Sequence, residues 1–198
     1  MARTQAADYE RKRDAIVQTA AALFARDGFM GVSVSDLATA CSTSKSLIYH
    51  YYPSKEDILH AVMASHIDQL SEDVAAAAAA GGDARERLRG LVHRFMQHYV
   101  GAADRQKVLL NELPRLPDDK RRAIVAQQRG IIDAVTGLLQ EIEPRLAGDP
   151  IRARARAMML FGMINWTHTW YDAAGPLKPD EIAETAFRLA TCASAQAS

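Results

Sequence analysis

The sequence predicts an all-α fold, with an N-terminal three-helix domain followed by a helical bundle, about nine helices in all. Apolar residues recur at the i, i+3, i+4 spacing of helices along almost the whole chain. Glycine and proline fall between these segments, where helices end, as at Gly28, Pro53 and Gly81-Gly82. The sequence shows no alternating strand pattern and no internal repeat, so each segment below is read as a helix.

Composition sets limits on the class of protein. The chain has 198 residues with 48% hydrophobic and 24% charged residues, as in an ordinary soluble protein, and its formal net charge is zero. A nucleic-acid partner would therefore be held by placed contacts rather than by a global basic field. Cys41 and Cys192 are too few for a disulfide framework. With no apolar leader and no run of ~20 apolar residues, we expect a cytoplasmic protein.

The chain should open with a flexible arm over residues 1–8. Arg3 and the basic run Arg11–Arg13 could enter a minor groove, or the arm could be a solvated tail. The first helix is expected from Tyr9 to Asp27, with Ile16 among the residues on its apolar face. Gly28 can adopt the left-handed conformation that ends it.

A helix-turn-helix is predicted over about residues 34–52, within a domain of residues 9–53. Ser33 and Asp36 form a capping-box pattern, which starts a helix. The polar run Ser42–Ser44 interrupts that helix, because Ser and Thr favour turns and N-caps. A second short helix, Lys45–Tyr51, carries hydroxyls, a lysine and aromatic residues, the types that bind phosphates and base edges. A helical hairpin whose tyrosines belong to the core fits the composition equally well.

The stretch SKSLIYHYYPSKE at residues 44–56 resembles the recognition helix and the following helix start of TetR-family transcriptional regulators, which run SKGTLYHYFPSKE or close to it. The resemblance covers roughly residues 12–72. The chain departs from the pattern at Ser42 and Ser46, where glycine is usual, at Thr43 in place of valine, and at Leu47 in place of threonine.

From this resemblance we expect an all-helical homodimer that binds a pseudo-palindromic double-stranded DNA operator and is released from it by a small molecule, as a ligand-responsive repressor. The candidate residues for the base-facing edge are Thr43, Ser44, Lys45 and Leu47. The candidates for phosphate contacts are Ser33, Tyr49, His50 and Lys55.

A linking helix over residues 54–80 should join this domain to a ligand-binding and dimerisation domain over residues 81–198. Further helices are expected at 84–100, 105–113, 118–143, 151–172 and 179–193. The helix over 151–172 is apolar on nearly every side, so a partner subunit or a ligand must cover part of it. This helix and the last one, over 179–193, would pair with the same two helices of a second subunit and form a four-helix interface with twofold symmetry. The candidate interface residues are Phe161, Gly162, Asn165, Thr169, Ala186, Leu189 and Ala190.

The C-terminal stretch GMINWTHTWYDAAGPLKPDEIAETA is also similar to repressors of catabolic pathways that respond to CoA thioesters. The resemblance implies an acyl- or aryl-CoA effector. The candidate lining residues of an apolar tunnel are Phe95, Tyr99, Ile132, Trp166 and Trp170. Arg129 or the Arg121-Arg122 pair is the candidate cation for the anionic ligand. Each of these could instead be an ordinary core or surface residue.

No catalytic constellation is found. The histidines lack the i, i+4 pairing of a zinc helix, so we expect no metal and no cofactor. Ser42–Lys45 formally matches SxxK, but it has no partner motif and lies in the predicted turn. We therefore expect no enzyme, with an all-helical enzyme or small-molecule carrier without a DNA role as the alternative.

Overall fold

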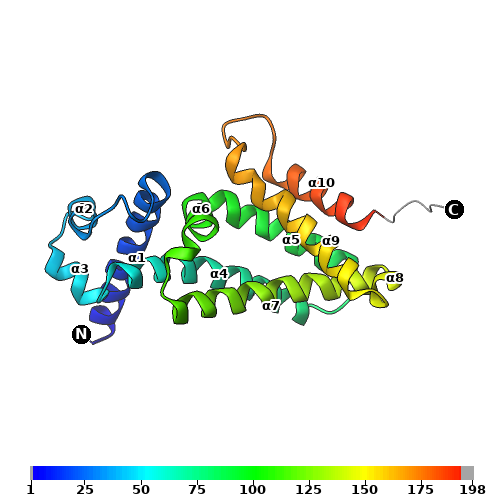
Figure 1. Ribbon diagram of the computed structural model, residues 1–198, viewed down its shortest axis with the longest axis horizontal. Helices are drawn as coiled ribbons and strands as arrows, with labels where there is room; N and C mark the ends of the chain where they lie inside the picture. Colours follow the sequence, from blue (N-terminus) through cyan, green and yellow to red (C-terminus); the bar gives the residue numbers. More distant parts are fainter. Residues whose placement is uncertain (1, 193–198) are drawn as a thin grey trace. The chain divides into compact units, whose positions relative to one another are not determined.

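The computed structural model describes the backbone of residues 2–192 and the side chains of residues 7–192 (Figure 1). Over these residues every regular element is helical, which confirms the predicted all-α class. The α-helices are α1 (Ala2–Asp27), α2 (Val34–Ala40), α3 (Lys45–Tyr51), α4 (Lys55–Ala79), α5 (Ala84–Gly101), α6 (Ala103–Glu112), α7 (Asp118–Ile142), α8 (Pro144–Ala147), α9 (Pro150–Asn165) and α10 (Pro179–Thr191). Two short 3₁₀ helices lie at Leu113–Arg115 and Trp166–Thr169.

The chain divides into two compact units. The first contains Met1–His66 and Asp104–Ile124, and the second contains Ile67–Ala103 and Val125–Ser198. This division differs from the predicted boundaries, because α6 and the first turns of α7 group with the N-terminal helices. The predicted domain over 81–198 also ends in residues 193–198, which lie outside the described residues.

The core of the first unit joins α1, α2, α3 and the start of α4. Phe24, Leu37, Ile48 and Ile58 are fully buried, one from each of these helices. The helix α1 already begins at Ala2, so the expected flexible arm over residues 1–8 is wrong for the residues from Ala2 onward. The side chains of Asp8 and Arg11 and those of Asp8 and Lys12 pair one helical turn apart, which favours this helical extension.

A tight turn joins α2 to α3. The N–H of Thr43 donates to the carbonyl of Ala38 at 2.8 Å, and the N–H of Ser42 donates to that of Thr39 at 3.0 Å. These are the two hydrogen bonds of a Schellman motif, which requires its C′ residue in the left-handed region. Ser42 holds that position with a φ of 50°, the one positive φ among the described residues other than glycine.

Two polar contacts attach α6 and α7 to α4 within the first unit. His66 and Gln106 are both buried, and His66 Nε2 lies 2.7 Å from Gln106 Oε1. Lys120 at the start of α7 forms an ion pair with Asp57, which also accepts a hydrogen bond from Ser54. The Lys120 ammonium and then the Ser54 hydroxyl hold the pKa of Asp57 below its ordinary value. These contacts explain why residues 104–124 belong with the N-terminal helices.

The second unit is a bundle whose core comes mainly from α5, α7, α9 and α10. Its most buried large side chains include Leu88, Phe95 and Met96 of α5 and Leu139 of α7. The helix α10 packs against α5 and α9 (Figure 1). At its edge, Arg89 of α5 donates to Glu184 of α10 at 2.8 Å and holds the pKa of Glu184 below its ordinary value.

The single helix expected over residues 151–172 is shorter in the structure. The α-helical part ends at Asn165, a 3₁₀ turn covers Trp166–Thr169, and Trp170 and Tyr171 follow it. A short helix, α8, was not anticipated between α7 and α9. Within residues 2–192, none of these helices combines the length and apolarity that a bilayer crossing requires.

The positive φ of Ser42 predicts a stability gain from Ser42→Gly. Glycine reaches the left-handed region without the Cβ clash, so we expect the free energy of unfolding to rise by about 1 kcal/mol. The matched control is Ser46→Gly within α3, where glycine should lower stability by about 0.5 kcal/mol. Urea unfolding of both variants measures the difference. A destabilised Ser42→Gly would contradict the strain argument.

Candidate nucleic-acid interface and apolar groove

The outward face of α3 is the first candidate site. Ile48 is fully buried and Tyr52, at the C-cap, is nearly so, and they anchor the helix in the core of the first unit. With 100° between successive residues, Ser46 and His50 point most directly away from this core. The exposed residues are Lys45, Ser46, Leu47, Tyr49 and His50. They present hydroxyl, ammonium, imidazole and apolar groups on one surface.

The N-terminus of α3 is capped by Ser44. Its Oγ accepts a hydrogen bond from the N–H of Leu47 at 3.2 Å, as an N-cap serine does. Thr43, just before it, is half-buried in the turn. The structure therefore places Thr43, Ser44, Lys45 and Leu47 together at one end of α3, and the Ser44 hydroxyl has a structural role there.

The C-terminal end of α3 is supported by an aromatic contact with α1. The ring of Tyr9 lies 4.7 Å from that of Tyr51 and meets the His50 ring edge to face at 6.2 Å, measured between centroids. Arg13 of α1 lies over the Tyr52 ring at 5.9 Å. Tyr49, in contrast, is 49% exposed. Tyr49 and His50 thus remain at the surface beside α1.

Ser33 is engaged within its own helix cap. Its N–H and its hydroxyl both donate to Asp36 Oδ2, at 2.8 Å and 2.7 Å, and its Oγ accepts from the N–H of Asp36. These hydrogen bonds, that of the hydroxyl first, lower the pKa of Asp36. The predicted capping box is present, and a phosphate contact donated by the Ser33 hydroxyl would have to replace that hydroxyl's own hydrogen bond to Asp36 Oδ2.

Lys55 has a different role from the one expected. Its Nζ donates to the carbonyl oxygens of Phe29 and Val32, both at 2.9 Å, and lies 4.1 Å from the centroid of the Phe29 ring. The side chain is partly buried against the α1–α2 connection. We expected a phosphate contact, but two of the three ammonium hydrogens are directed into the protein. Lys55 is a clip that fixes the connection between α1 and α2.

Ser46 is the exposed residue that the sequence reasoning left out of the site. In the sequence it stands out only as a departure from the glycine of the TetR pattern. The helical wheel of residues 45–51, drawn with Ile48 inward, would have placed it near the centre of the outward face.

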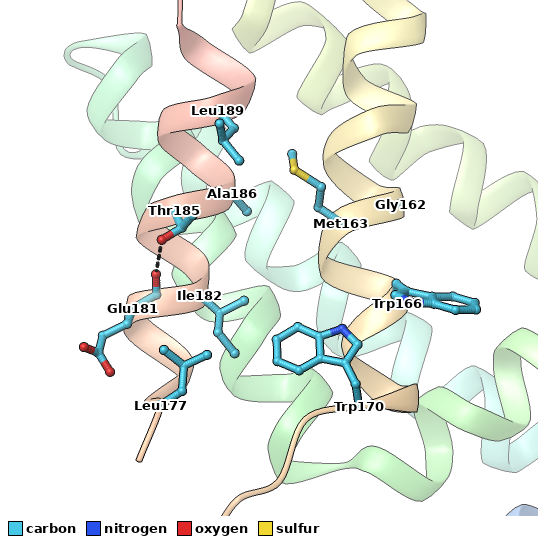
Figure 2. Close-up of a pocket in the computed structure, with 10 residues that line it drawn as sticks. All are labelled: Gly162, Met163, Trp166, Trp170, Leu177, Glu181, Ile182, Thr185, Ala186 and Leu189. Carbon is cyan, nitrogen blue, oxygen red and sulfur yellow. Dashed lines mark hydrogen bonds between the residues drawn. The ribbon is translucent and has the colours of Figure 1, made fainter. Parts of the chain in front are cut away.

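The second candidate site is an apolar groove between α9 and α10, with a volume of about 480 Å³ (Figure 2). Trp170 lies between the two helices and faces Ile182 and Leu177. Glu181, the only charged lining residue, accepts a hydrogen bond from the N–H of Lys178 at 2.8 Å, and its carboxylate points away from the groove. The other lining residues are Gly162, Met163, Trp166, Thr185, Ala186 and Leu189. This is a surface that an apolar partner could fill.

The predicted tunnel residues do not share one cavity. Phe95 and Tyr99 are buried and stacked at 6.3 Å, and Phe161 packs on Phe95 at 5.9 Å, so these three rings fill the core of the second unit. Trp166 and Trp170 line the surface groove instead. Ile132 is half-buried and Arg129 is exposed, both on α7.

The predicted interface residues fall into two groups. Gly162, Ala186 and Leu189 line the groove, and Thr169 is exposed nearby, with its hydroxyl donating to the carbonyl of Trp166. Phe161 and Ala190 are buried within the subunit, and Asn165 is half-buried. The two groups arise because the spacing of apolar residues shows which faces of a helix are apolar. It does not show which of those faces packs within the subunit and which lies at its surface.

No metal centre is formed by the residues whose positions are described, since no three His, Cys, Asp or Glu side chains gather closely enough. One group of such side chains joins α5 to α10: His93 Nδ1 lies 3.1 Å from Asp180 Oδ1, and His93 Nε2 lies 3.4 Å from Glu184 Oε2. Its two carboxylates bind opposite nitrogens of one imidazole ring, so it is an ion-pair cluster.

Comparison with known proteins matches two segments of the chain to families. Residues 16–62 match the family "Bacterial regulatory proteins, tetR family", and residues 81–193 match "Tetracyclin repressor-like, C-terminal domain". A TetR-family transcriptional regulator from Bordetella parapertussis has a similar structure, with a TM-score of 0.86 and 39% identity over 90% of this chain and 93% of that one.

Two further relatives carry information on ligands and function. AibR in complex with isovaleryl coenzyme A and operator DNA has a TM-score of 0.79 and 25% identity, over 90% of this chain and 97% of that one. The transcriptional activator FasR of Mycolicibacterium smegmatis is 23% identical over 91% of this chain and 82% of its own length. One other curated regulator is matched over 81 residues at 33% identity, which is 41% of this chain but only 40% of that regulator.

The two family matches and the relatives named above are regulators of transcription, which contradicts the alternative of a helical enzyme without a DNA role. TetR regulators bind operator DNA as homodimers and respond to small molecules. The helix-turn-helix of α2 and α3, the helical bundle of the second unit and the two family matches lead to one conclusion: the chain belongs to the TetR family of DNA-binding transcriptional regulators.

Proposed function

We propose that this protein is a ligand-responsive repressor that binds a pseudo-palindromic operator as a homodimer and leaves it when a small molecule binds. The observation that carries the proposal is the outward face of α3, where polar and basic side chains are held exposed by the buried anchor Ile48. As DNA is its target, the cytoplasm is the proposed location.

In the proposed complex, the two α3 helices of a dimer enter successive major grooves about 34–36 Å apart. Thr43, Ser44, Lys45 and Leu47 face the bases. Tyr49 and His50 contact phosphates, since both are exposed at the end of α3 that α1 supports. Lys55 is assigned a positioning role, because its ammonium holds the carbonyls of Phe29 and Val32.

We further propose that a second copy of the chain covers the groove between α9 and α10. Large apolar side chains are exposed along both helices: Trp166 is 65% exposed and Leu189 is 62% exposed. An apolar surface of this kind is rare on a monomer and typical of an interface. A symmetric four-helix interface would cover it and would hold two recognition helices at a fixed spacing.

For the effector we propose an acyl- or aryl-CoA thioester. AibR, similar over most of the chain, is found with isovaleryl coenzyme A and operator DNA, and that similarity is the support for this class. An anionic ligand needs cations, because its phosphates cannot be buried unpaired. Arg129 on α7 is exposed and is the proposed cation for such a ligand. For the mode of regulation we propose repression, although the relative FasR is a transcriptional activator.

The release mechanism follows from linkage. An effector that binds the non-operator state about 100-fold better than the operator-bound state supplies about 2.7 kcal/mol of coupling. Within the first unit, α6 and the start of α7 are joined to α4 by the His66–Gln106 and Asp57–Lys120 contacts. We propose that a shift of α7 on effector binding reaches the start of α4, and hence α3, through these contacts.

Two lysines give a matched test of the DNA contacts. Lys45→Ala removes a proposed contact, so operator affinity should fall and the slope of log K against log salt should decrease by about 1 per subunit. Lys55→Met removes the clip, so thermal stability should fall while the salt slope is unchanged. Gel shifts across a salt series, together with thermal melts, measure both. Salt-insensitive binding with no effect of Lys45→Ala would refute the DNA interface.

The groove is tested by Leu189→Glu, which places a carboxylate on the exposed apolar face. We expect a folded monomer, because Leu189 contributes little to its own subunit's core, and a loss of operator affinity of roughly 100-fold or more through lost bivalency. Sedimentation and gel shift are the measurements. Met30→Glu, an exposed apolar residue of the first unit, is the matched control and should stay dimeric. A dimeric Leu189→Glu protein would reject this interface.

The effector class is tested by thermal shift with acyl- and aryl-CoA thioesters beside their hydrolysis products. We expect a thioester to raise the melting temperature and to weaken operator binding, while free CoA and the free acid do neither at equal concentration. Arg129→Ala should reduce the apparent affinity for the thioester. Equal responses to thioester and free acid would assign the acid as effector, and no response to any thioester would end the CoA proposal.

A further inference from the structure

Leu47 is an apolar side chain on a face that is otherwise polar. It is 37% exposed, although the neighbouring Ile48 is fully buried and supplies the apolar anchor that α3 needs. Lys45, Ser46, Tyr49 and His50, the other exposed residues of this helix, all carry a hydrogen-bonding group. Core packing therefore does not explain a leucine at this position.

The backbone holds Leu47 in place. Its N–H donates to both the Oγ and the carbonyl oxygen of Ser44, at 3.2 Å and 3.1 Å, and the next residue is fixed in the core. A leucine side chain has few rotamers in a helix, so its methyl groups sample a small region in front of the first turn of α3. Such a fixed apolar group can discriminate between ligands by shape.

We propose that Leu47 selects thymine in the operator by packing on its 5-methyl group. This inference rests on the proposed function, because it assumes that α3 enters the major groove. Among the base edges exposed there, thymine alone carries an apolar group, and the other edges offer donors and acceptors. Leucine can satisfy none of those polar groups, so covering them with Leu47 removes their water without replacing the hydrogen bond. The same side chain thus attracts thymine and disfavours the other bases.

A contact of Leu47 with the sugar-phosphate backbone is the competing explanation. Such a contact would lower affinity equally for all sequences when leucine is shortened, because the backbone carries no sequence information. The thymine methyl can be removed alone, by deoxyuridine, which keeps every polar group of the base pair. The comparison isolates the proposed contact from all others.

The test begins with an operator selected from a random duplex pool by the full-length dimer. Each thymine is then replaced by deoxyuridine in both half-sites, and affinity is measured for the wild type, Leu47→Ala and Leu47→Met. We expect one position where the wild type loses about fourfold per half-site, from one buried methyl group. Leu47→Ala should bind thymine and uracil operators alike, while Leu47→Met should keep most of the preference. Met30→Ala is the control for an exposed apolar residue elsewhere and should keep all of it.

Each outcome decides the matter. A flat deoxyuridine scan with the wild type, or an equal loss in Leu47→Ala, would overturn the role of Leu47 while leaving the DNA-binding function intact. If the folded dimer enriches no sequence at all, the proposed function fails and the thymine contact fails with it. Thermal melts of the Leu47 variants, expected to match the wild type, show that the fold is kept.

Discussion

The tight turn between α2 and α3 is the constraint on which the DNA-facing surface depends. Each of these helices has only seven residues, too few to be stable alone, so their orientation comes from their caps and a shared core. The Schellman hydrogen bonds end α2, and Ser44, two residues after the left-handed Ser42, caps α3. Ile48 then fixes the rotation of α3 about its axis. A turn one residue longer or shorter would change the orientation of α3 and with it the side chains that the helix presents to solvent.

The two units are stabilised by different kinds of contact. In the first, directional contacts fix the helices and their connections: the Ser33–Asp36 capping box, the Lys55 clip and the Asp57–Lys120 ion pair. In the second, long amphipathic helices bury large apolar side chains such as Phe95 and Met96, and the surplus apolar surface remains between α9 and α10. The DNA-facing surface of α3 therefore belongs to the first unit, and the apolar groove between α9 and α10 belongs to the second.

Local patterns predicted the helices and the capping box well, because caps, glycines and apolar spacing act over a few residues. The role of Lys55 could not be predicted from local sequence patterns, because its carbonyl partners at Phe29 and Val32 lie more than twenty residues earlier in the chain. The grouping of α6 with the N-terminal helices likewise depends on the distant His66–Gln106 pair. The aromatic residues of the C-terminal half were misassigned for a related reason. Periodicity shows that Phe95, Tyr99 and Trp166 are apolar positions, but it does not say which of them face the core and which face the surface.

The position of the tryptophans has a practical consequence. The chain has two tryptophans, Trp166 and Trp170, and both line the groove between α9 and α10. Neither lies in α1–α4, so the intrinsic indole emission of the unmodified protein originates entirely at that groove. Tryptophan emission spectra therefore report on the surroundings of this groove without any engineered label. They do not report directly on the DNA-facing helices. The protein therefore carries its own spectroscopic probe at the apolar groove between α9 and α10.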